Sequence, residues 1–182
     1  MPATFEKIAS TTLSSPALSI TFSSISQDYT DLQVHLRCKA ASTNGQHIYV
    51  RMGNGSVDTN NIYANQSLFD RGSPSPATSG DWSSSFLSSY YIPYASYISS
   101  ASNNFSALQF YVFNYSATNT KKAVQSLSNT VTGNNNEYPA IEFSNAMINT
   151  SAAINIIEFR HSNSAINLDT GTSITIYGIK KA

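Results

Sequence analysis

Alternation of apolar and polar side chains constrains the fold of this chain more than any other feature of its sequence. The segment "DLQVHLRCKA" (31–40) places its apolar residues on one face and its polar residues on the other. The same period of two recurs in "ALSITFS", "HIYVRMG", "FSALQFYVF", "AVQSLSNTV", "AIEFSNA", "INIIEFRHS" and "TSITIYGI". This period is that of a strand half buried in a β-sheet, and no stretch shows a convincing helical period.

Short segments rich in Asn, Gly and Ser separate the expected strands, among them "STNGQ", "GNGSVDTNN", "TGNNNE" and "NLDTGT". Short strands joined by such turns predict an all-β fold. We expect residues 1–182 to form a single domain, an antiparallel β-sandwich. A jelly roll is the first expectation and an immunoglobulin-like sandwich is the alternative. "FSALQFYVF" is apolar on both faces, which is typical of a central strand or of a strand at a subunit contact.

Two longer loops are expected at 71–85 and 90–104. Pro74, Pro76 and Pro93 lie in these segments. Proline cannot donate a hydrogen bond to a neighbouring strand, so central strands are excluded at these positions.

Charged residues make up only 11% of the chain, and its formal net charge is zero. An average soluble domain carries about 25% charged residues. Because a surface without a net field does not attract a polyanion, we expect no nucleic-acid partner. Low charge also weakens the repulsion between copies, which suits a protein that works inside an assembly.

Targeting signals are absent from the sequence. "MPATFEKIAS" has no long apolar run and no cleavage-site pattern, so no secretory signal is expected. No stretch approaches about 18 consecutive apolar residues, so we expect no membrane partner.

Cys38 is the only cysteine of the chain. It alternates with Leu32, Val34 and Leu36, so we expect a buried thiol that acts as a small apolar side chain. A reactive thiol needs an exposed and positively charged neighbourhood, whereas the cations of this strand lie on its other face.

That other face carries His35, Arg37 and Lys39. A solvated sheet face with cross-strand partners is the favoured interpretation. A contact with a neighbouring subunit is the sharper alternative. A polyanion site ranks third, because three charges without further basic residues give little affinity.

Motifs for catalysis are missing. The three histidines lack the spacing of a metal site, and neither a Gly-x-Ser-x-Gly elbow nor a phosphate-binding loop occurs. Glu142 and Glu158 fall on different expected strands, where solvated strand faces explain them better than a carboxylate pair does. Asp58 is the only acid in "GNGSVDTNN", which favours an Asx-rich turn over a calcium site. We therefore predict a protein that is not an enzyme and that holds no metal and no cofactor.

Aromatic residues gather in and near the two expected loops: Trp82, Tyr90, Tyr91, Tyr94 and Tyr97. Such residues among many small polar ones could stack on the sugars of a host surface glycan. A layer that caps the sandwich or fills a subunit contact is the favoured alternative, since aromatic residues are enriched at protein interfaces.

Three segments resemble structural proteins of tailed bacteriophages, notably phages of cyanobacteria and other marine bacteria. They are "SITFSSISQDYTDLQVHLR" (19–37), "FNYSATNTKKAVQSLS" (113–128) and the terminal "ITIYGIKKA". These are framework motifs. In "ISQDYTDL" we expect Asp28 or Asp31 to accept backbone N–H bonds and Tyr29 to cover the corner of the turn.

The resemblance implies a virion component, made in the host cytoplasm and released without an export signal. We expect a non-enzymatic structural protein exposed on the particle surface as a head decoration or cement protein. A tail fibre or spike subunit that contacts the host receptor and a carbohydrate-binding module are the alternatives. The expected partners are other copies of the chain, in a homotrimer, and other capsid or tail proteins. The number three comes from the three-fold symmetry common among phage surface proteins.

Overall fold

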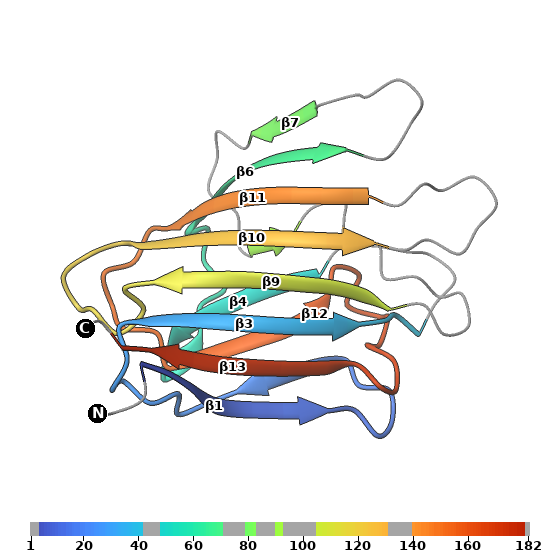
Figure 1. The fold of residues 1–182 in the computed structure, drawn as a ribbon, viewed down its shortest axis with the longest axis horizontal. Helices are drawn as coiled ribbons and strands as arrows, with labels where there is room; N and C mark the ends of the chain where they lie inside the picture. Colours follow the sequence, from blue (N-terminus) through green and yellow to red (C-terminus); the bar gives the residue numbers. More distant parts are fainter. Residues whose placement is uncertain are drawn as a thin grey trace.

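The computed structural model describes residues 4–41, 48–70, 79–82, 90–92, 105–130 and 140–180. These residues form strands and connections without a helix (Figure 1). The strands are β1 (Phe5–Thr12), β2 (Ser19–Phe22), β3 (Asp31–Cys38), β4 (Ile48–Asn54), β5 (Ser56–Val57), β6 (Tyr63–Asp70), β7 (Ser79–Trp82), β8 (Tyr90–Ile92), β9 (Ser106–Phe113), β10 (Lys122–Thr130), β11 (Ala140–Ile148), β12 (Ile156–His161) and β13 (Ser173–Ile179). Within the described part of the chain, no helix is long and apolar enough to cross a membrane.

Two antiparallel sheets make up the fold. The large sheet has the strand order β1-β13-β3-β9-β10-β11-β6-β7. The small sheet has the order β2-β12-β4-β5, and β8 also pairs with β4. The small sheet lies behind β13, β3 and β9 in Figure 1, whereas β11, β6 and β7 extend beyond it. The expected all-β sandwich is confirmed.

The strand order does not confirm the jelly roll. A jelly roll joins its two sheets through two Greek keys. Here β9, β10 and β11 follow one another along the chain and are also neighbours in the large sheet, as in a meander.

Strand β3 shows why the alternating sequence folds in this way. Leu32, Val34, Leu36 and Cys38 turn inward and are at most 4% exposed. Burial raises the pKa of the Cys38 thiol to about 12, as expected for the buried and unreactive cysteine that the sequence predicts. The strand lies between β13 and β9, so both its edges are paired.

The core lies where the two sheets face each other. The ring of Phe110 on β9 lies 6.1 Å from the ring of Phe159 on β12, measured between centroids. Tyr63 of β6 reaches the small sheet, where its hydroxyl oxygen accepts a bond from the N–H of Met52 at 2.7 Å. These contacts join strands of both sheets into one apolar cluster.

Residues of the segments 19–37, 113–128 and 174–180 meet at one corner of the sandwich. Tyr29 is 8% exposed and lies against Gly178 of β13. The hydroxyl of Ser116 donates to the carbonyl of Tyr29 at 2.6 Å, and the N–H of Asn114 donates to Oδ1 of Asp31 at 2.6 Å. Tyr29 therefore covers the corner, as predicted. Asp31 accepts a backbone N–H as predicted, but from the second segment rather than from its own turn.

Five strands, β1, β5, β6, β7 and β8, were not expected from the sequence, and β5 lies inside the predicted turn segment "GNGSVDTNN". β7 and β8 fall inside the predicted loops 71–85 and 90–104, so those loop predictions are wrong at 79–82 and 90–92. Both strands are short and pair with β6 and β4, so tertiary contacts rather than local alternation establish them. β6 follows a turn-rich segment. In β1, a bulge between Lys7 and Ala9 interrupts the period of two.

Candidate functional site

The outer face of the large sheet carries the predicted cations. His35 and Arg37 are exposed there. Arg37 lies over the ring of Phe105, 3.6 Å from its centroid, and the ring of His35 lies 5.2 Å from that of Tyr177. In a single chain, His35 and Arg37 therefore lie on an exposed sheet face and contact aromatic side chains of the same chain.

Lys39 has a different environment. Its ammonium lies 2.9 Å from Oδ2 of Asp169, and both side chains are largely covered. The hydrogen bond from Lys39 holds the pKa of Asp169 below its usual value. Lys39 therefore forms an ion pair at the end of β3 and does not form a binding patch with His35 and Arg37.

The predicted aromatic cluster is divided between the two sheets at the level of the backbone. Trp82 pairs with Gln66 in the large sheet, whereas Tyr90 and Tyr91 belong to β8, which pairs with β4 in the small sheet. Tyr94 and Tyr97 lie outside the described residues.

Farther along the same outer face, β6, β11 and β10 present large apolar side chains to the solvent. Phe143 of β11 pairs in register with Leu68 of β6 on one side and with Leu127 of β10 on the other. Ile141 follows on the same face of β11. We call these four residues the apolar row; Leu68, Phe143, Leu127 and Ile141 are 59, 39, 52 and 57% exposed, respectively. Scattered exposed apolar residues are normal, whereas these four are neighbours on three adjacent strands.

A shallow depression of about 330 Å³ joins the apolar row to the cationic part of the face. Leu127 and Ile141 lie on one side of it and His35 on the other, with Gln109 and Asn129 also contributing. The cationic part, which the sequence predicts, and the apolar row, which it does not, therefore lie on one continuous face.

At the level of the apolar row, the inner face of the same three strands carries buried polar side chains. Ser67, Ser144 and Ser126 face one another across β6, β11 and β10, and each is at most 2% exposed. The hydroxyl of Ser144 lies 3.2 Å from Oδ1 of Asn65.

Glu142 lies next to these serines and is 1% exposed, so the prediction of a solvated glutamate is wrong. The alternation of β11 is as predicted, but its polar face turns inward. Glu158 lies in the other sheet, where Oε2 approaches Nη1 of Arg51 at 3.9 Å. The two glutamates therefore form no carboxylate pair.

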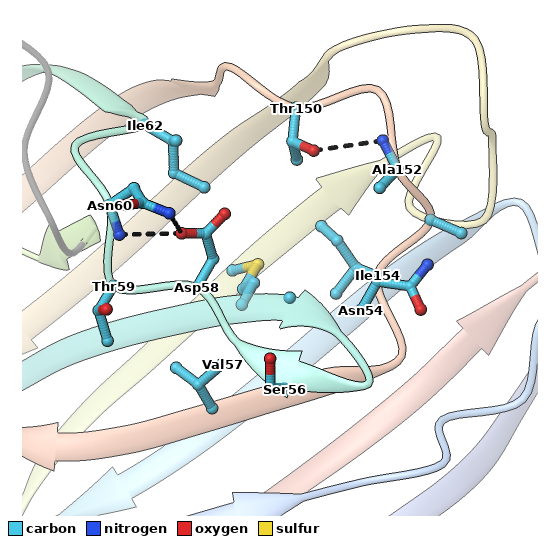
Figure 2. A pocket seen from close by; sticks show the side chains of 13 residues that line it. Asn54, Ser56, Val57, Asp58, Thr59, Asn60, Ile62, Thr150, Ala152 and Ile154 are labelled. Carbon is cyan, nitrogen blue, oxygen red and sulfur yellow. Dashed lines mark hydrogen bonds between the residues drawn. The ribbon is translucent and has the colours of Figure 1, made fainter.

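A second concave site lies at the end of the small sheet (Figure 2). It has a volume of about 290 Å³ and lies between the β4–β5 hairpin with the segment after it and the loop before β12. Oδ1 of Asp58 accepts bonds from the backbone N–H and the side-chain amide of Asn60, both at 2.8 Å. This is the Asx turn that the sequence favours.

Within the described part of the chain, no group of three or more His, Cys, Asp or Glu side chains could hold a metal ion. The sequence pointed to Asp58 but not to the pocket. The opposite wall comes from residues 150–154, about 90 positions farther along the chain.

Comparison with family models, with curated proteins and with solved structures gives no match for this chain. Its function is therefore argued from its own residues and surfaces.

Proposed function

We propose that this protein is a non-enzymatic structural component of a tailed-bacteriophage virion. In this proposal it lies on the particle surface as a head decoration or cement protein, and the outer face of its large sheet attaches it to neighbouring subunits. The observation that carries the proposal is the apolar row, with Phe143 at its centre.

The size of the hydrophobic contribution supports an interface. Covering a large apolar side chain completely contributes roughly 1.5–3 kcal/mol. The four residues of the apolar row are about half exposed, so each would contribute roughly half of this amount when a neighbour covers it. Together, these four contributions offset part of the entropy cost of association, so the apolar row can form the centre of a larger contact.

A second copy of the chain is the partner that we favour for this face. The formal net charge is zero, so two copies meet without long-range repulsion. Beside the apolar row lie the amide side chains of Gln66, Asn145 and Gln125, which are paired across the same three strands. Such amides both donate and accept hydrogen bonds, so a matching set on another copy can satisfy them. We take a closed trimer as the expected assembly, in line with the resemblance to phage surface proteins.

The assignment to a phage particle rests on the three sequence segments that resemble phage structural proteins. Their meeting at one corner, through Tyr29, Ser116 and Gly178, supports a shared framework. A framework of this kind carries no catalytic chemistry of its own.

Electron microscopy of purified particles tests this function. Particles would be isolated from infected cells that express the chain with a gold-binding or fluorescent tag. We expect the label on the head surface, at positions that follow the head lattice. Label confined to the tail would favour a fibre or spike subunit instead, and unlabelled particles would contradict a virion role.

A further inference from the structure

We infer that the pocket of Figure 2 binds one unit of a neutral sugar. This inference is independent of assembly through the apolar row, because the pocket belongs to the small sheet and to the loop before β12. It also differs from the glycan contact considered for the aromatic residues, because the described residues that line this pocket come from 52–62 and 150–154.

Both walls of the pocket are fixed by backbone hydrogen bonds. On the hairpin side, the N–H of Asp58 donates to the carbonyl of Met52 at 3.1 Å. On the loop side, the N–H of Asn155 donates to the carbonyl of Gly53 at 2.9 Å, and that of Asn149 to the carbonyl of Ile62 at 2.7 Å. A preformed cavity spares a ligand the entropy cost of ordering the site.

Gly53 explains how the hairpin closes tightly enough to form the pocket. A β-carbon at this position would lie 2.0 Å from the carbonyl oxygen of Ser56 and 2.9 Å from the backbone nitrogen of Asp58. Only glycine permits this approach of two backbone segments. The side chain of Asn155 supports the same hairpin, since its Oδ1 accepts the N–H of Gly55 at 2.7 Å.

The polar groups of the pocket match hydroxyl groups. The second carboxylate oxygen of Asp58, Oδ2, accepts no hydrogen bond from any residue that the structure describes. Figure 2 shows Asp58 and Asn60 on one side of the pocket and Thr150 on the other. A carboxylate accepts bonds from two adjacent hydroxyls, while an amide and a hydroxyl supply donors to the ring oxygen or to a third hydroxyl.

The charge of the lining excludes other ligand classes. Among the described residues that line the pocket there is no Lys, Arg or His, so none of them attracts a phosphate or a carboxylate. Asp58 is the only acidic residue in the described part of the lining, and its Oδ1 already accepts two hydrogen bonds from Asn60. A calcium ion takes six to eight oxygen ligands and favours several carboxylates, so one half-engaged carboxylate gives a poor site.

The apolar part and the volume agree with a sugar ring. Val57 and Ile62, which are both partly exposed, provide surface for the C–H groups of such a ring. The volume of about 290 Å³ lies at the lower end of the range for small-molecule pockets, which suits a single unit rather than an extended chain.

Chemical-shift mapping with the full ¹⁵N-labelled chain tests the inference. Glucose, galactose, mannose, rhamnose and N-acetylglucosamine would be added one at a time, with glycerol and calcium chloride as further probes. We expect one or more of the sugars to shift the amide signals of residues 54–60 and 150–154 together. The affinity should be weak, roughly millimolar, because a single sugar offers few atoms for contact.

Asp58→Asn is the decisive variant, because the remaining side-chain oxygen can still accept the N–H of Asn60 and keep the turn. We expect it to weaken sugar binding at least about tenfold, which corresponds to 1.4 kcal/mol. Asp169→Asn is the matched control, since Asp169 pairs with Lys39 at the far end of β3; this variant should bind like the native chain.

Three results would overturn the inference. In the first, none of the sugars shifts both sets of amide signals. In the second, Asp58→Asn binds as well as the native chain. In the third, glycerol or calcium produces the same shifts at the same concentration.

Discussion

The ring of Tyr29 occupies the space that a side chain at residue 178 would need. A β-carbon on Gly178 would lie 2.3 Å from Cγ of Tyr29. The ring is held from other sides as well, because its hydroxyl bonds to Oε2 of Glu6 at 2.7 Å and the ammonium of Lys180 lies 5.3 Å from its centroid. The glycine of the Tyr-Gly-Ile sequence in the last strand is therefore explained by Tyr29, in the turn that precedes β3.

Gly178→Ala should destabilise the fold. The added methyl group forces the ring of Tyr29 or the backbone of β13 to move, and overpacking of this kind typically costs about 1–3 kcal/mol. Unfolding in urea measures the change. Thr175→Ala, on the outer face of the same strand, is the control and should cost less. In a Tyr29→Ala background the penalty of Gly178→Ala should shrink, and an undiminished penalty would refute the packing explanation.

Lys122→Met should destabilise the protein by about 2–4 kcal/mol, because hydrogen bonds from a charged donor are among the stronger ones. The ammonium of Lys122 is buried and donates to the carbonyls of Thr120 at 2.6 Å, Ala117 at 2.7 Å and Ser151 at 3.3 Å. The exposed neighbour Lys121 provides a matched control, since Lys121→Met removes the same charge without these bonds. Equal losses from the two variants would show that the three bonds contribute nothing specific.

His161 should make the stability depend on pH below about 6.5. The side chain is fully buried, and burial lowers the pKa of the imidazole from its ordinary value of 6.5. The backbone N–H of Asn163 donates to Nδ1 at 2.9 Å, which requires an unprotonated Nδ1. As the pH falls through 6.5, the unfolded chain takes up a proton that the folded chain does not, so the free energy of unfolding decreases toward the lower folded-state pKa.

Urea titrations at several pH values, with native protein and His161→Gln, measure this effect. The difference between the two proteins should vary between pH 7 and the folded-state pKa and should be constant above pH 7. A difference that stays constant across the whole range would contradict a buried neutral histidine.

Much of the fold follows from the sequence because alternation identifies strands, as it does for β3 and β9. Alternation does not say which face of a strand is buried. In "AIEFSNA" both assignments have the same period, and the apolar residues Ile141 and Phe143 turn outward while Glu142 turns inward. The face is decided by what covers the sheet on each side, and a local pattern carries no information about that.

The surroundings of Lys122 and of Asp58 likewise could not be predicted from the local sequence. Lys121 and Lys122 are adjacent in the sequence, yet of these two only Lys122 is buried, because the carbonyls that accept its hydrogen bonds come from two separate loops. The pocket likewise combines a hairpin with a loop about 90 residues away. Asp58 could be recognised as a turn residue from its neighbours, whereas the cavity beside it depends on tertiary structure.

Phe143→Ser should abolish self-association without unfolding the protein. Phe143 is partly exposed, so its replacement should change the free energy of unfolding by about 1 kcal/mol or less. Sedimentation equilibrium at micromolar concentration should show an oligomer, expected to be a trimer, for the native chain and a monomer for the variant. Leu18→Ser is the control, because Leu18 is 58% exposed but lies outside the apolar row. Loss of the oligomer in both variants would contradict a role specific to the row.

We infer that the apolar row holds this protein in a virion. Competition between the native chain and a variant for incorporation into particles tests this role. Native chain and the double variant Leu127→Ser/Phe143→Ser would be expressed together in infected cells with two different tags. The ratio of the tags would then be measured in purified particles and in the lysate. We expect particles to contain the native chain. The ratio of variant to native chain should be at least about tenfold lower in particles than in the lysate, which is equivalent to 1.4 kcal/mol of contact energy. Equal incorporation of both chains, or particles that contain neither, would contradict it.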